Sequence, residues 1–113
     1  MLAQETDRRV PGINKSLKRL AESSDPDSIG VEDLRVEVHG LKGAAMVVGQ
    51  VRLGDLAKRA EKALADRADQ GTIDPDLAGR LAAAVEAFHE GTRAAADGDP
   101  EPASVAASLA ALP

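Results

Sequence analysis

VEDLRVEVHGLKGAAMVV, residues 31–48, is the segment with the strongest periodic pattern in the chain. Its apolar residues recur at alternating spacings of three and four, which is typical of an α-helix that buries one face. The pattern therefore predicts an amphipathic helix whose buried stripe faces a core. The stripe consists of Val31, Leu34, Val38, Leu41, Ala45 and Val48.

The composition of the chain favours helices over sheets. Its 113 residues are enough for one domain, and they include one phenylalanine but no tryptophan, tyrosine or cysteine. The core must therefore consist of Leu, Val, Ile and Ala, which suit closely packed helices and suit a β-sheet poorly. The absence of cysteine excludes disulfides and thiolate metal sites.

Charge and hydropathy limit the partners and the location. The net charge of −5 argues against nucleic acid as the main partner, because phosphate binding requires a basic surface. No apolar run is long enough to span a membrane. The opening residues MLAQETDRRV lack the basic-then-apolar order of a secretory signal. We therefore expect a cytoplasmic protein with no membrane or nucleic-acid partner.

Four further segments carry apolar residues at helical spacing. In the first segment, Pro11 and Gly12 leave two possibilities: the helix starts there with proline in its first turn, or it begins near residue 3 and is kinked. The residues expected to face inward in these segments are Val10, Ile13, Leu17 and Leu20; Leu53, Leu56, Ala60 and Leu64; Leu77, Leu81, Ala84, Val85 and Phe88; and Val105, Leu109 and Leu112.

Turn and capping residues divide these segments into separate helices. We expect the third helix over residues 51–69, with Gly71 as its stop, and the fourth helix after Asp74 as N-cap. Short connections make successive helices antiparallel neighbours. The sequence therefore predicts an all-α fold, an antiparallel up-down four-helix bundle with a short fifth helix at the C-terminus, in a single domain over residues 1–113.

Two glycines stand inside the helix predicted for residues 31–48, although each costs about 1 kcal/mol relative to alanine. They are Gly40 and Gly43, next to His39, which lies on the flank of the buried stripe and should be partly exposed. Lys42, Gly43 and Met46 follow on the same edge of the helix. An exposed imidazole with a cleared approach and a nearby cation is a suitable site for a phosphoryl group on nitrogen.

Less specific interpretations of these residues remain open. A single helical histidine and a helical lysine are most often solvated surface residues, although solvation does not explain the glycines. A packing role, in which glycine lets another helix approach closely, could explain Gly40 or Gly49, and Gly49 could also simply end the helix.

Residues 39–61, HGLKGAAMVVGQVRLGDLAKRAE, resemble the signature of histidine phosphotransfer (HPt) domains. The resemblance covers nearly the whole chain, and it looks closest to the N-terminal phosphotransfer domain of CheA-like chemotaxis histidine kinases. The segments ETDRRVPGINKSLKRL, GTIDPDL and SLAAL suggest this subgroup. The residues that match the signature are His39, Leu41, Lys42, Gly43, Gly49, Leu53, Leu56 and Glu61.

The resemblance implies a role in a two-component system or phosphorelay. His39 would be phosphorylated on its outer ring nitrogen by a separate ATP-binding histidine kinase domain, and would pass the phosphoryl group to an aspartate of a response-regulator receiver domain. Glu61 would accept a hydrogen bond from the other ring nitrogen, and Lys42 would stabilise the phosphoryl charge. The domain would be a phosphoryl carrier without a cofactor of its own, while the separate kinase domain binds ATP and Mg²⁺; the full-length protein could be a histidine kinase.

The resemblance also implies a docking face around the histidine. Gly43 would make room for the regulator, and Met46 and Val47 would provide an adaptable apolar contact. Lys58, three residues before Glu61, replaces the second polar or histidine residue that the CheA-like subgroup often has there. We include Lys58 among the docking residues. A lysine at this position should make the charge around the imidazole different from that in the subgroup.

Two other functions fit the same sequence. One is a free-standing phosphorelay protein, and the other is a catalytically silent helical interaction module; the presence of both His39 and Glu61 argues against the second. His89 is interpreted as a surface residue, because the apolar residue and proline that should follow the phosphoacceptor of dimeric sensor kinases are missing. The two histidines are fifty residues apart and match no metal-ligand pattern.

Overall fold

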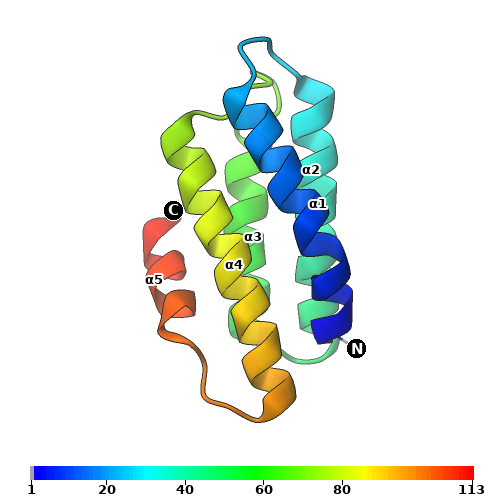
Figure 1. The fold of residues 1–113 in the computed structure, drawn as a ribbon, viewed down its shortest axis with the longest axis vertical. Helices are drawn as coiled ribbons and strands as arrows, with labels where there is room; N and C mark the ends of the chain where they lie inside the picture. The colour runs from blue at the N-terminus through cyan, green and yellow to red at the C-terminus, as the bar shows by residue number, and fades with distance from the viewer. Residues whose placement is uncertain (1) are drawn as a thin grey trace.

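A computed structural model describes residues 2–113 as five helices without strands. The predicted all-α bundle with a short fifth helix is confirmed (Figure 1). None of the helices in this part of the chain is long and apolar enough to cross a membrane. The helices are α1 (Leu2–Glu22), α2 (Ser28–Val47), α3 (Val51–Ala65), α4 (Pro75–Asp97) and α5 (Ala103–Ala111).

The four long helices pack in a ring around one core. Helix α1 contacts α2 and α4, helix α3 contacts the same two helices from the other side, and the most extensive contact joins α2 to α3. Figure 1 shows α1 and α4 in front, α2 and α3 behind, and α5 lying beside α3 and α4. Phe88, the one aromatic side chain, is 2% exposed within this aliphatic core.

All the residues predicted to face inward are buried except Val48. Val48 is 46% exposed, because α2 ends at Val47 and the chain reverses direction immediately. Gly49 adopts a φ of +76°, its N–H donates to the Met46 carbonyl at 3.1 Å, and the Gln50 N–H donates to the Ala45 carbonyl at 2.9 Å. This paired hydrogen bonding around a left-handed glycine terminates a helix. The alternative in which Gly49 ends the helix is therefore confirmed.

Helix α1 continues through Pro11, so the longer of the two predicted helices is the one observed. Proline removes one helical hydrogen bond to the carbonyl of residue 7. The turn before it is held by tertiary packing, since Thr6 and Val10 are buried, while Pro11 itself faces solvent. Packing on both sides of the proline offsets the lost bond.

Helix α3 ends at Ala65, and the prediction of a helix to residue 69 is wrong. After Ala65 the chain makes turns with tighter hydrogen bonds, from the Arg67 N–H to the Leu64 carbonyl and from the Ala68 N–H to the Ala65 carbonyl. Bonds that span three residues draw the chain away from α-helical geometry. Gly71 ends these turns rather than the helix itself.

Helix α4 begins as the sequence predicts. The Asp74 carboxylate accepts a hydrogen bond from the Leu77 N–H at 3.3 Å, and Pro75 occupies the first turn, where its missing N–H leaves no helical bond unmade.

Candidate functional site

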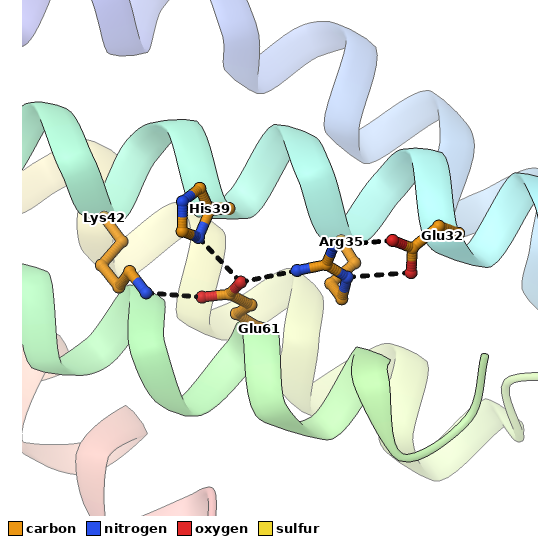
Figure 2. Close-up of polar contacts among 5 residues, drawn as sticks. All are labelled: Glu32, Arg35, His39, Lys42 and Glu61. Atoms are coloured by element: carbon orange, nitrogen blue, oxygen red, sulfur yellow. Dashed lines mark hydrogen bonds and ion pairs between the residues drawn. The ribbon is translucent and has the colours of Figure 1, made fainter.

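His39 projects from α2 beside Glu61 of the neighbouring helix α3 (Figure 2). The distance from His39 Nδ1 to Glu61 Oε2 is 2.8 Å, and the imidazole is 57% exposed while the Glu61 side chain is only 13% exposed. The predicted exposure of His39 is confirmed. An ionised carboxylate only accepts hydrogen bonds, so Nδ1 carries the proton and the lone pair of the neutral ring lies on the outer nitrogen, Nε2.

The Glu61 carboxylate also contacts two cations. Lys42 Nζ lies 2.9 Å from Oε1, and Arg35 Nη1 lies 2.8 Å from Oε2, the oxygen that His39 also contacts. Partial burial raises the pKa of Glu61, but the hydrogen bonds from Lys42 and His39 outweigh it and leave this pKa below the ordinary glutamate value. Glu61 is therefore a carboxylate, not a carboxylic acid, at neutral pH.

Arg35 was not among the site residues that the sequence indicated. Its guanidinium is held on the other side by Glu32, with Nε 2.8 Å from Oε2 and Nη2 2.6 Å from Oε1. Figure 2 shows Arg35 between the two glutamates, one turn before His39 on α2. The signal that could have found it is the spacing of four residues to His39, which places both side chains on the same edge of the helix.

The two glycines beside His39 have different surroundings. Gly43 is exposed, and a Cβ added there would meet no heavy atom of the described residues within 4 Å. A Cβ added at Gly40 would lie 3.0 Å from Nη1 of Arg9, whose guanidinium bridges Glu5 and Glu37. Gly40 therefore makes room for an α1 side chain, which agrees with a packing role, whereas Gly43 leaves the surface beside His39 open.

The residues predicted to contact a partner all lie on the surface. Met46 is 55% exposed and Val47 is 86% exposed, both in the last turn of α2. Met46 extends over Gly54 of α3, where an added Cβ would come within 2.5 Å of its Sδ atom. Lys58 is exposed on α3, nearly one turn before Glu61. Met46 and Val47 thus follow His39 at the end of α2, and Lys58 precedes Glu61 on α3.

His89 lies at the surface between α4 and α1, as the sequence suggested, but its side chain is paired. Its side chain is only 20% exposed, and Nε2 lies 2.5 Å from Oδ1 of Asp7 on α1. Arg93, one turn further along α4, contacts the same carboxylate oxygen at 3.1 Å. The sequence did not indicate this pairing, because the partner lies 82 residues away in the chain, which helical spacing cannot reveal. The described residues include no group of three or more His, Asp or Glu side chains placed to hold a metal ion.

Comparison with known families identifies the class of protein. The sequence profile of the Hpt domain matches residues 1–91, from α1 through most of α4, and the chain therefore belongs to the Hpt domain family. Hpt domains perform histidine phosphotransfer in two-component signalling, as phosphoryl carriers rather than catalysts, and interact with histidine kinases and response regulators. A comparison with curated proteins finds no match.

Proposed function

We propose that His39 is the phosphoacceptor of this Hpt domain. The observation that carries the proposal is the different environment of the two ring nitrogens: Nδ1 contacts Glu61 at 2.8 Å, while the ring as a whole is 57% exposed. A proton fixed on Nδ1 leaves the Nε2 lone pair available as a nucleophile. His89 has the opposite arrangement, since its Nε2 is occupied by Asp7.

The first transfer takes the phosphoryl group from ATP bound with Mg²⁺ in a separate histidine kinase domain. The Nε2 lone pair forms a bond to the γ-phosphorus, and the bond from that phosphorus to the β,γ-bridging oxygen breaks, so that ADP leaves with the electron pair. The ring keeps its Nδ1 proton and acquires positive charge. Glu61 stabilises this charge through its hydrogen bond to Nδ1, which is the role of an acidic partner beside a reactive histidine.

The second transfer reverses the charge change on the ring. An aspartate oxygen of a receiver domain bonds to phosphorus, the P–Nε2 bond breaks, and its electron pair returns to Nε2. No proton leaves Nδ1 in either step, so Glu61 acts as a fixed electrostatic partner throughout. Lys42, whose ammonium already lies 2.9 Å from Glu61, provides positive charge beside the phosphoryl oxygens.

The receiver docks on the α2–α3 face around His39. Gly43 keeps the approach to the imidazole clear, and the exposed Met46 and Val47 supply apolar area that adapts to a partner. Lys58 adds positive charge from α3 that complements an acidic acceptor site.

The domain most resembles the phosphotransfer domain of a CheA-like chemotaxis kinase, so we place it in a cytoplasmic signalling protein of that type. The fifth helix, α5, lies beyond the residues matched by the family profile and supports this subgroup through its ending SLAAL. A free-standing phosphorelay carrier would use the same site chemistry.

A phosphorylation assay tests the proposal. The chain is incubated with the catalytic domain of a CheA-type kinase and radiolabelled ATP, and the product is exposed to acid and to base. We expect a label that is acid-labile and base-stable, as phosphohistidine is, and that moves to a receiver domain when one is added. The variant His39→Gln should take up no label. Label that persists in this variant, or that resists acid, contradicts the assignment, and a wild-type chain that takes up no label favours the silent interaction module.

A further inference from the structure

We infer that Arg35 is a positioning residue for His39 and acts through Glu61. This inference rests on the proposed function, because it concerns how the phosphoacceptor is oriented. Arg35 Nη1 lies 2.8 Å from Glu61 Oε2, and His39 Nδ1 lies 2.8 Å from the same oxygen. The guanidinium and the imidazole therefore share one acceptor atom.

Arg35 and Lys42 together constrain the Glu61 carboxylate more than Lys42 would alone. A carboxylate oxygen has two acceptor sites, and Arg35 occupies one site of Oε2 while leaving the other for His39. Lys42 holds the second oxygen, Oε1, at 2.9 Å. The carboxylate is thus fixed at both oxygens, and its remaining acceptor site at Oε2 meets the inner nitrogen of the imidazole (Figure 2).

The guanidinium is in turn fixed by Glu32. Nε and Nη2 of Arg35 donate to the two Glu32 oxygens at 2.8 and 2.6 Å, and this leaves Nη1 for Glu61. The planar fork of arginine can bind one carboxylate with two parallel bonds and reach a second, whereas a lysine ammonium is a point charge without this geometry. The Arg35 side chain is 27% exposed, so solvent only partly competes for its bonds.

The charges of this network nearly cancel. Two carboxylates, Glu32 and Glu61, face two cations, Arg35 and Lys42. Arg35 therefore changes the field at the imidazole less than an unpaired cation would, and its main contribution is orientation. If the Glu61 carboxylate were free to turn toward Lys42, the neutral imidazole could also place its proton on Nε2, and the outer nitrogen would then lack a lone pair for phosphorus.

Two substitutions separate orientation from charge. Arg35→Gln removes the fork and the charge, and Arg35→Lys keeps the charge without the fork. The readouts are the ¹⁵N chemical shifts of the His39 ring, which report the tautomer without any phosphorylation, and the phosphorylation kinetics with the kinase catalytic domain. The matched control is Arg80→Gln on α4. It breaks the ion pair between Arg80 and Asp76, whose N–O distance is 2.9 Å and which lies on a different helix from the site.

For both Arg35 variants we expect the neutral ring to shift from the Nδ1–H tautomer toward Nε2–H. The phosphorylation rate should fall by roughly tenfold, less than the ~10²-fold expected for an acid–base partner itself. The apparent KM for the kinase domain and the far-UV circular dichroism should remain unchanged. Glu32→Gln, which loosens Arg35 without removing it, should give the same changes with smaller size, and Arg80→Gln should match the wild type.

Several results would overturn the inference. Full rescue by Arg35→Lys would show that charge, not the fork, is what His39 requires. Wild-type ring shifts in Arg35→Gln would show that Glu61 is positioned without Arg35. If the phosphorylation rate falls only because the apparent KM for the kinase domain rises, Arg35 contributes to docking of that domain rather than to orienting His39. If the wild-type chain is not phosphorylated at all, the proposed function fails, but the ring shifts still decide whether Arg35 orients His39.

Discussion

The chain contains two histidines that each face a carboxylate on a neighbouring helix, and their geometries are opposite. His39 on α2 contacts Glu61 through its inner nitrogen, Nδ1, and is 57% exposed. His89 on α4 contacts Asp7 of α1 through its outer nitrogen, Nε2, and is 20% exposed. Both carboxylates also contact an arginine, Arg35 in the first pair and Arg93 in the second.

This comparison separates what makes a histidine reactive from what makes it structural. An ionised carboxylate fixes the proton on whichever nitrogen it contacts, so the lone pair of the neutral ring is displaced to the other nitrogen. At His39 the lone pair lies on the outer atom, which a phosphoryl donor can approach. At His89 it lies on the inner atom, nearer the backbone. Both carboxylates join two helices, but only the contact through Nδ1 leaves the lone pair on the outer nitrogen, as the proposed role of His39 requires.

The strongest test of this comparison removes each imidazole in turn. His39→Gln should abolish labelling by a kinase catalytic domain, because no nucleophilic nitrogen remains at the exposed position. His89→Gln should leave the extent of labelling at the wild-type level. Quantitative phosphorimaging of both variants at equal concentration measures the contrast, and a loss of label in His89→Gln would show that the two sites are not separate in function.

The second test exchanges the carboxylates for amides. Glu61→Gln keeps the shape of the side chain but removes the charge that supports the ring, so phosphorylation by the kinase domain should slow by ~10²-fold, the low end for a positioned acid–base group. Asp7→Asn, the matched change at the other pair, should leave the rate unaltered. Rapid-quench measurements of the phosphorylation rate of both variants test this expectation. Equal rates for Glu61→Gln and the wild type would show that the Glu61 charge has no role in phosphorylation.

The third test fills the open surface beside His39. Gly43→Leu should remain folded, since an added Cβ meets no described heavy atom within 4 Å, but it should obstruct both phosphorylation and transfer to the receiver. Gly43→Ala should hold or raise the Tm, because glycine inside a helix is unfavourable by about 1 kcal/mol.

The control for Gly43→Leu is Gly79→Leu on α4, an exposed helical glycine that likewise has no described heavy atom within 4 Å of an added Cβ. This variant should fold and take up label normally. A Gly43→Leu protein with a strongly lowered Tm would indicate overpacking, which typically costs about 1–3 kcal/mol. Normal transfer by a folded Gly43→Leu protein would show that access to His39 does not depend on this glycine.

The smallest effect concerns the stability provided by the His89 pair. The hydrogen bond from His89, aided by Arg93, lowers the pKa of Asp7 below the ordinary aspartate value of about 3.9. A lowered folded-state pKa stabilises the protein above the unfolded value, and this stabilisation is lost as the pH falls through the folded value. Asp7→Asn should therefore slightly lower the Tm at pH 7, and the difference from wild type should vanish in strong acid. A constant difference at every pH would indicate that the charge of Asp7 is not involved.

The sequence predicted the core of the fold because burial follows helical spacing within each segment. The failures lie where the chain leaves that spacing. Val48 fits the stripe of α2 but lies beyond its last turn, where Gly49 reverses the chain. Residues 66–69, which are polar apart from Ala68, continue a plausible helix, but backbone bonds over three residues end it at Ala65. Such endings depend on backbone hydrogen bonds that apolar spacing does not encode.

The candidate site was predictable in part. The exposure of His39 followed from its place beside the stripe, whereas the pairing with Glu61 came from the resemblance to a family signature. Arg35 was missed because its spacing of four residues to His39 gives only a shared helix edge, and its contacts with the two glutamates depend on how the helices pack. The Asp7 contact of His89 was missed for the same reason, since it joins α1 to α4 across 82 residues of the chain.

The short connection between α2 and α3 has a consequence for how the site can change. His39 lies nine residues before Val48 and Glu61 lies eleven residues after Gln50, so both sit at similar heights above the turn, roughly 14 and 16 Å along their helices. One residue inserted within α2 after His39, or within α3 before Glu61, would shift that side chain by about 1.5 Å along its helix and rotate it by about 100° relative to the turn. Such an insertion within a helix should separate His39 from Glu61 and weaken phosphorylation of the proposed acceptor while leaving the chain helical. The connection at residues 98–102 joins α4 to α5 and not the two helices of the pair, so we expect changes in its length to leave phosphorylation of His39 unaltered.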